Sequence, residues 1–376
     1  MDIDPPSVSR PGDYEYVFPA IRGVQARRQY YVTMWPLRLI PKLFLFDSEE
    51  LPPEMRAQRT LNRARVPEMA RYIVENPDSY IFSALTASVN ADVRFEPMVS
   101  DGSSADRVGK LTIPMDARFV INDGQHRRAA IARALEENTD LSDETIAIVL
   151  FIDVGLSRSQ QMFADLNRHA IRPSRSIGVL YDHRDPMSEV AKQAVLRSAL
   201  YSDLTEMETS NLAARSRKLF TLSAFYTADR ALLEDITMDG LDESIDLVTS
   251  YWERVGKQFP TWNQVHEGKV SAGEVRKDFI HSHGIVLHAL GKVGNALLRS
   301  SRSPARWERE LKKLGDVDWH RSNSAVWEGR ATIGGKVSKG ASNVLLTTAY
   351  IRGVLGMPLP PEEQSADEAF ARGEKK

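Results

Sequence analysis

Hydrophobic and polar residues alternate along the first part of the chain, which predicts β-strands. Residues 14–24 and 29–34 follow a period of two, and Ala26-Arg27-Arg28 lies between them as the turn of a hairpin. Residues 81–89, 93–99 and 111–115 predict further strands, and 93–99 is expected to pair with 81–89. Residues 146–152 form a nearly unbroken apolar run, which is typical of a buried strand.

Apolar residues spaced by three or four predict helices elsewhere. Residues 54–76 place Val66, Ala70 and Ile73 on one face, with Pro67 in a first turn. The same segment carries Arg65 and several other arginines, which form either a solvated helix face or a basic wall beside an anion site. Further helices are predicted at residues 157–169, 190–200, 212–233, 241–255, 276–298 and 344–355, whereas 37–46 fits either a helix or a strand.

This order of elements predicts an α+β fold with two domains. A flexible leader, residues 1–13, precedes a mixed domain of strands and helices at 14–180. A mainly helical domain follows at 181–358, because few strand patterns occur after Pro173. Residues 359–376 are polar and charged, which predicts a disordered tail.

Composition narrows the function classes. The 376 residues carry a net charge of −2, so any nucleic-acid surface must be local rather than global. Cysteine is absent, which excludes disulfides, thiolate metal sites and a cysteine nucleophile. The acidic, polar N-terminus does not resemble a signal peptide, and no apolar run approaches the roughly 18–20 residues that span a bilayer. We therefore expect a cytoplasmic protein that does not enter a membrane.

One stretch, residues 123–130, has the sequence pattern of an anion site. The apolar run 117–121 predicts a strand, Gly124 a turn, and 129–137 a helix, with His126, Arg127 and Arg128 at its N-terminal end. A helix N-terminus has unpaired N–H groups and a partial positive charge, and glycine allows close approach, so phosphate is the natural ligand. The alternative is a surface helix that begins with basic residues by chance.

The sequence Asp123-Gly124-Gln125-His126-Arg127 resembles the DGQHR-domain proteins, and residues 15–356 resemble the DndB family of bacterial DNA phosphorothioate (sulfur) modification systems. The resemblance extends to segments 18–23, 58–59, 65–66, 72–73 and 165–167. DGQHR domains are similar to the ParB/sulfiredoxin fold, whose members bind nucleotides. The resemblance therefore implies that the N-terminal domain is ParB/sulfiredoxin-like and binds ATP or another nucleotide.

By the same resemblance, His126 and Arg127 hold nucleotide phosphates, and Gln125 occupies the position of the sulfiredoxin cysteine. Asp123 shapes the turn or helps to hold Mg²⁺. The implied nucleotide-binding residues are Asp123, Gly124, Gln125, His126, Arg127, Arg128, Asn167 and Arg168.

A second segment matches the other nucleotide motif of ParB proteins only in part. Arg168 and Pro173 keep their places, Asn167 replaces a glutamine, and Ala164 stands where the glutamate is expected. Asp165 either holds Mg²⁺, which prefers carboxylates together with phosphates, or only orients a helix end. Asp123 and Asp165 are thus the candidates for a catalytic role.

Two basic clusters are candidates for DNA binding, because phosphate contacts supply most of the affinity for DNA. The first contains Arg172 and Arg175, close in sequence to the second motif. The second contains Arg215, Arg217 and Lys218 on a helix expected at residues 211–223, which is equally consistent with a solvated helix face.

His281, His283 and His288 fit partly buried helix histidines better than a metal site, because matching carboxylates are scarce. The resemblance implies a repressor that binds double-stranded DNA upstream of its own operon. The alternative is an ATP-binding or ATP-hydrolysing enzyme component of the modification machinery. Other modification proteins are expected partners, and symmetric operators would favour a homodimer.

Overall fold

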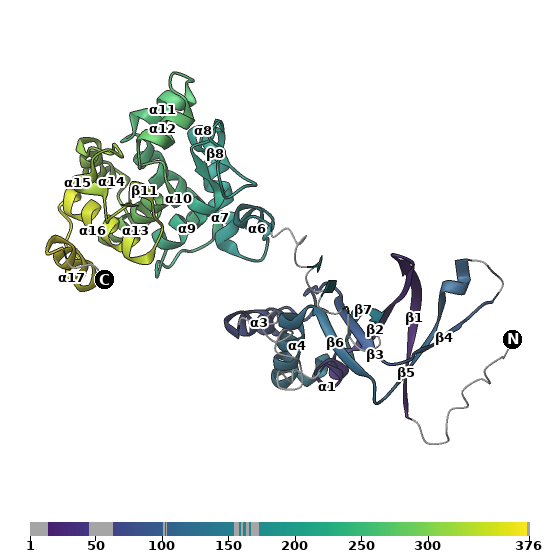
Figure 1. The fold of residues 1–376 in the computed structure, drawn as a ribbon. Helices are drawn as coiled ribbons and strands as arrows, with labels where there is room; N and C mark the ends of the chain where they lie inside the picture. The colour runs from purple at the N-terminus through teal and green to yellow at the C-terminus, as the bar shows by residue number, and fades with distance from the viewer. Residues whose placement is uncertain are drawn as a thin grey trace. The chain divides into compact units, whose positions relative to one another are not determined.

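The computed structural model describes residues 14–44, 63–100, 102, 104–153, 158, 161–162, 165–166 and 173–373. Contacts divide the chain into two compact units, 1–171 and 172–376 (Figure 1). The division falls before the boundary predicted near residue 180. The predicted leader, residues 1–13, lies outside the described residues.

The described part of the first unit is built on a seven-stranded mixed sheet with the order β4-β5-β1-β2-β7-β3-β6. Neighbouring strands are antiparallel except β3 and β7, which run parallel. The hairpin of β1 and β2 turns at Ala26 and Arg27, both of which have positive φ angles. The strands are β1 (Glu15–Gln25), β2 (Arg28–Pro36), β3 (Leu85–Asn90), β4 (Arg94–Pro97), β5 (Val108–Pro114), β6 (Arg118–Asp123) and β7 (Thr145–Ile152).

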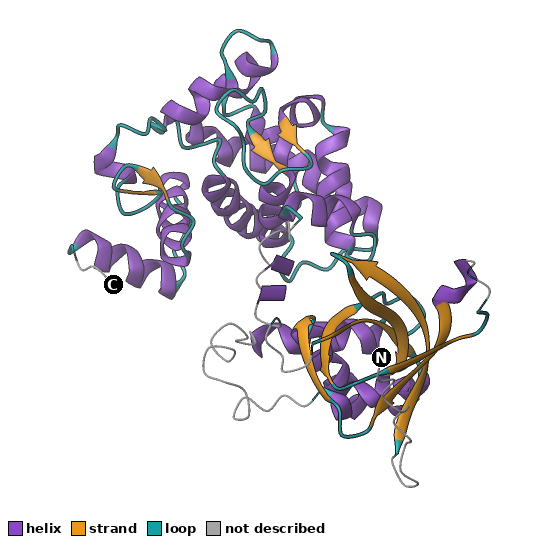
Figure 2. Cartoon of the chain, turned by 45° about the vertical axis from the view of Figure 1, so that its right-hand side comes forward, coloured by secondary structure: helices purple, strands orange, loops and turns teal. Residues whose placement is uncertain are grey.

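Short helices cover one side of this sheet, near β6 (Figure 1, Figure 2). Trp35 is fully buried between them and the sheet, stacked on Phe18 and Phe44 and edge-on to Phe119. The helices of this unit are η1 (Leu37–Leu39), α1 (Ile40–Leu43), η2 (Arg63–Arg65), α3 (Val66–Glu75), η3 (Ser104–Arg107), α4 (Gln125–Glu137) and η4 (Thr139–Asp143).

The mixed content of strands and helices agrees with the predicted α+β class, and β7 is an interior strand as expected. One predicted pairing is wrong. β4, within residues 93–99, pairs with β5 rather than with β3, since Phe95 lies opposite Leu111. The part of the helix predicted at 54–62 lies outside the described residues.

The second unit is mainly helical in the residues described (Figure 2). Its helices are α6 (Arg175–Tyr181), α7 (Pro186–Arg197), α8 (Ala199–Leu204), α9 (Leu222–Leu232), α10 (Leu241–Gly256), α11 (Pro260–His266), α12 (Ala272–Asp278), α13 (Gly284–Ser300), α14 (Pro304–Leu311), η6 (Lys312–Asp316), α15 (Ser324–Trp327), α16 (Ala341–Leu355) and α17 (Pro361–Ala371). Two short strand pairs complete it, β8 (Thr205–Glu206) with β9 (Phe220–Thr221) and β10 (Thr332–Ile333) with β11 (Lys336–Val337).

The core of this unit is built around α9, α10 and α13. α13 packs closely against α9 because Gly291 has no Cβ; an added Cβ would lie 2.2 Å from the carbonyl oxygen of Ala228. Tyr201, Phe225 and Trp252 form edge-to-face contacts beside this crossing. This crossing fixes the relative positions of α9 and α13.

Three predictions for this unit are wrong in detail. The helix expected from residue 212 begins only at Leu222, and the one expected at 276–298 is interrupted by residues 279–283 between α12 and α13. The expected disordered tail contains α17, which starts at Pro361 and buries Glu363 in an ion pair with Arg352 at 2.9 Å. Local composition did not indicate that partner, which lies on α16.

Candidate functional site

Residues 123–128 form the strand, turn and helix start that the sequence predicts. β6 ends at Asp123, Gly124 has a φ of 107°, and α4 begins at Gln125. A Cβ on Gly124 would also lie 2.4 Å from Cδ2 of Leu85. Both the left-handed backbone and the lack of space therefore require glycine here.

Arg127 closes this turn. Its Nη2 lies 2.6 Å from Oδ2 of Asp123, and its Nη1 donates to the carbonyl of Ser83 at 3.1 Å. The Arg127 side chain is 14% exposed and the Asp123 side chain 49%. The two predicted residues are thus brought together, and Asp123 presents a partly exposed carboxylate beside the helix start.

Arg128 points to a different part of the unit. Its Nε donates to the Phe44 carbonyl at 2.9 Å, and its Nη2 donates to the Pro41 carbonyl at 3.1 Å. Burial lowers the pKa of its guanidinium. These bonds attach α4 to the end of α1, so they serve the packing of the two helices, and its predicted phosphate contact stays a prediction.

His126 lies partly buried in the first turn of α4. Burial and the positive charge of Arg65 lower the pKa of its imidazole, which favours the neutral form at neutral pH. The interaction brings Arg65, from the segment just before α3, into the neighbourhood of the turn. From the sequence, this arginine could belong either to a solvated helix face or to a basic wall beside the anion site. Its closeness to His126 favours the second interpretation.

The start of α4 has the electrostatics of an anion site. Gly124 occupies the N-cap position and supplies no capping hydrogen bond, and no acidic residue lies in the first turn. A helix of 13 residues has a partial positive charge at this end, where His126 and two arginines also lie. The N–H groups of this helix end can bind a phosphate, while Arg127 is already paired with Asp123 and Arg128 donates to carbonyls. The Gln125 side-chain amide donates to the Ile121 carbonyl at 3.4 Å.

The second predicted motif is described only in part. Asp165 is exposed and accepts a bond from the Gln161 amide at 2.7 Å, whereas Asn167, Arg168 and Arg172 lie outside the described residues. Within the described ranges, no three His, Asp or Glu side chains gather in a group that could hold a metal ion. The roles predicted for Asp165 and Mg²⁺ stay predictions.

Arg215, Arg217 and Lys218 lie on a loop between β8 and β9, and not on the predicted helix. Arg215 and Arg217 are exposed, while the Lys218 ammonium donates to the Asp203 carbonyl. The predicted DNA-binding residues therefore divide into two exposed arginines and one lysine whose ammonium is bonded to the protein itself.

Arg276 explains why residues 213–218 are not helical. Its guanidinium donates to the carbonyls of Ala213 at 2.8 Å, Ala214 at 3.1 Å and Ser216 at 3.2 Å, and also to that of Lys218. Carbonyls that would accept bonds within a helix are thus taken by one distant side chain. We call residues 211–219 the cationic loop.

Arg175 begins α6 behind the N-cap Ser174, and its guanidinium lies 5.7 Å from the ring centre of Tyr226. It belongs to the second unit, where it lines a cavity. It is not part of the cationic loop.

His281 is buried and His283 is partly buried. His281 accepts a bond from Trp262 at 2.9 Å, and burial lowers its pKa to about 3. Burial likewise lowers the pKa of His283 to about 4. Both are therefore neutral at neutral pH.

A family model described as DNA-sulfur modification-associated matches residues 18–358. The chain belongs to this family, DndB, which links it to DNA sulfur modification. No curated protein and no solved structure matches the chain. Among the described helices, none has the length and apolar character needed to cross a bilayer.

Proposed function

We propose that this chain is a DNA-binding regulator that represses a DNA phosphorothioate modification gene cluster. Membership of the DndB family supports a role in DNA sulfur modification. The observation that carries the DNA-binding part is the cationic loop, which holds Arg215 and Arg217 exposed while Arg276 fixes its backbone. A rigid loop loses little entropy on binding, so its arginines can contact DNA phosphates at low cost.

The second part of the proposal is that the turn at Gly124 binds the phosphates of a nucleotide. The uncapped start of α4 and the side chains of His126 and Arg127 support it. ATP is the first nucleotide to test. A bound nucleotide would regulate DNA affinity only if it binds the DNA-bound form of the protein and the DNA-free form with different affinities.

Removal of the two exposed arginines tests the DNA-binding part. The double variant Arg215→Ala/Arg217→Ala should bind upstream DNA more weakly and have a shallower dependence of log affinity on log salt, by about 0.9 for each phosphate that is no longer neutralised. Fluorescence anisotropy with labelled duplex over a salt series measures both quantities. Arg306→Ala/Arg309→Ala is the matched control, because it removes two exposed arginines from α14 of the same unit. If the loop variant and the wild type bound DNA with equal affinity, the cationic loop would not be part of the DNA interface.

An ATP-hydrolysing enzyme component is the alternative function. It is favoured by Asp123, whose carboxylate is 49% exposed beside the phosphate-binding turn, where Mg²⁺–nucleotide sites often use an acidic residue. Phosphate release from ATP, measured for the wild type and Asp123→Asn, distinguishes the functions. Turnover that Asp123→Asn abolishes would favour the enzyme, whereas ATP binding without turnover favours the regulator.

A further inference from the structure

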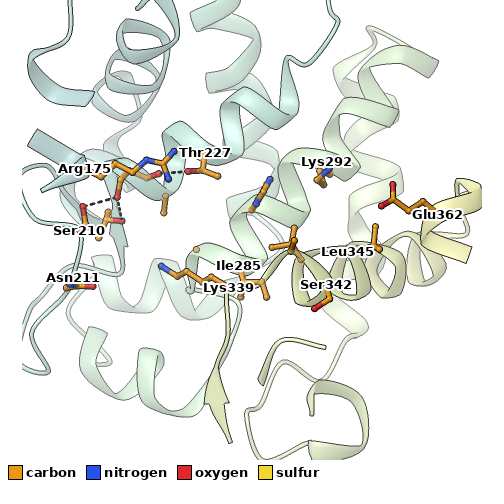
Figure 3. Close-up of a pocket in the computed structure, with 17 residues that line it drawn as sticks. Arg175, Ser210, Asn211, Thr227, Ile285, Lys292, Lys339, Ser342, Leu345 and Glu362 are labelled. Atoms are coloured by element: carbon orange, nitrogen blue, oxygen red, sulfur yellow. Dashed lines mark hydrogen bonds between the residues drawn. The ribbon is translucent and has the colours of Figure 1, made fainter. Parts of the chain in front are cut away.

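The helical unit contains a cavity of about 920 Å³ among α6, α9, α13, α16 and α17 (Figure 3). Small-molecule sites in proteins commonly measure about 300–1,000 Å³. The sequence did not indicate this site, because its lining comes from segments up to 187 residues apart, from Arg175 to Glu362. Of its lining residues, Asn211 also belongs to the cationic loop, and none belongs to the turn at Gly124.

The charges in this cavity are mostly positive. Arg175, Lys292 and Lys339 line it, and Glu362 is the only acidic residue in the lining that the structure describes. Among described residues, no carboxylate forms an ion pair with any of the three cations. The Glu363 carboxylate, which Lys292 also influences, is already paired with Arg352 at 2.9 Å. The cavity therefore holds more positive charge than its own residues neutralise.

The first turns of two long helices add to this positive charge. Gly284 and Ile285 of α13, and Ala341 and Ser342 of α16, all line the cavity. Neither helix has a side-chain cap or an acidic residue in its first turn. The ammonium of Lys339 lies 3.4 Å from the place of a Cβ on Gly284, so a cation stands at the positive end of α13. Both the ammonium and the helix end attract an anion.

The two ends of the cavity differ in chemistry (Figure 3). Arg175, Ser210 and Asn211 lie at one end, and the Lys339 side chain extends toward them. Serine hydroxyls lie at this end as well, and the Ser223 hydroxyl donates to the Ser210 hydroxyl at 3.4 Å. Leu345, Lys292 and Glu362 lie at the other end.

His288 lines the cavity between α13 and its neighbours. Burial and the charges of Lys292 and Arg175 lower the pKa of its imidazole, against the influence of Glu234. A neutral imidazole can donate one hydrogen bond and accept another. It therefore adds a polar contact for an uncharged part of a ligand.

We propose that this cavity binds a small phosphorylated molecule of nucleotide size. Arg175, Lys339 and the first turns of α13 and α16 hold its phosphates. The uncharged part lies toward Leu345, where Glu362 accepts hydrogen bonds from ligand N–H or O–H groups. A concave site walled by several helices does not admit the convex surface of a DNA duplex, so the ligand is a small molecule. The cavity lies in a different unit from the turn at Gly124 and is a second site.

Isothermal titration with ATP and with inorganic pyrophosphate tests the proposal, using Arg127→Ala protein so that the turn at Gly124 does not contribute. One molecule of probe should still bind to this protein. Adding Lys339→Gln should weaken that binding at least about tenfold, because the variant removes a charge-assisted hydrogen bond to phosphate. Lys336→Gln is the matched control, since it removes an exposed lysine from β11 that does not line the cavity. No binding to Arg127→Ala protein at millimolar probe, or unchanged affinity with Lys339→Gln, overturns the proposal.

Photolabelling of the wild-type chain with an azido derivative of ATP supplies a second measurement that needs no variant. Label on peptides from residues 284–292 or 339–345 supports the cavity. Label found on residues 118–137 alone overturns the cavity while leaving the nucleotide site at Gly124 intact, so the two proposals fail separately.

Discussion

Asp229 makes the stability of the helical unit depend on pH in a predictable direction. The carboxyl is fully buried in α9; its Oδ1 accepts from Trp252 Nε1 at 2.6 Å, while Oδ2 has no partner among the described residues. Burial raises the pKa of Asp229 from 3.8 to about 7, although the Trp252 bond opposes this. The folded protein therefore binds a proton more tightly than the unfolded chain does.

The size of the effect follows from this difference. A tenfold change in proton affinity corresponds to about 1.4 kcal/mol, so ionising Asp229 in the folded protein costs roughly 4 kcal/mol. The stabilisation is fully present below about pH 4 and is lost as the pH rises through about 7. Asp229→Asn keeps an oxygen for Trp252 and cannot ionise. It should therefore lack this loss, whereas His281 and His283 affect the wild type and the variant alike.

Urea denaturation between about pH 5 and pH 8, followed by tryptophan fluorescence, measures this dependence. Relative to Asp229→Asn, the wild type should lose roughly 3 kcal/mol of unfolding free energy from about pH 5 to about pH 8. Asp246→Asn is the control, because that carboxylate is on the surface of α10 with its side chain 73% exposed. Parallel profiles for the wild type and Asp229→Asn would refute the reasoning.

Three further substitutions test individual interactions. Gly124→Ala should destabilise the first unit by about 1–3 kcal/mol and abolish nucleotide binding, because its φ is 107° and Leu85 occupies the space; unchanged denaturation would contradict the strained turn. Arg276→Met should leave the cationic loop open to proteolysis and weaken DNA binding; a protease pattern like that of the wild type would show that the loop does not need its bonds from Arg276. Arg128→Gln should lower stability by about 1–3 kcal/mol with nucleotide affinity within about twofold of the wild type, because its bonds are to carbonyls; titration that shows weaker binding at full stability would assign Arg128 to phosphate.

Local patterns predicted the elements whose reasons are local. The β1–β2 hairpin follows from alternation and from a two-residue turn, and β7 follows from its apolar run. The turn at Gly124 was predicted because a strand end, a glycine and a cationic helix start are neighbours in sequence. The pairing of Arg127 with Asp123 was not predicted, although their spacing of four residues allows it.

Features set by distant partners were not predictable. The cationic loop has the composition of a helix, but Arg276 takes its carbonyls from about 60 residues away. Residues 279–283 leave the helix because His281 is buried against Trp262 and Phe259. α17 is held in place because Glu363 forms an ion pair with Arg352 of α16. The cavity proposed to bind phosphates is lined by three cations that come together only in the folded unit.

The central claim is that the chain recognises the DNA upstream of its own gene cluster. The most direct test is the affinity of the purified chain for that DNA and for a shuffled duplex of equal length, at one physiological salt concentration. A specific regulator should prefer the upstream DNA by at least about a thousandfold. Equal affinity for the two duplexes would contradict the claim.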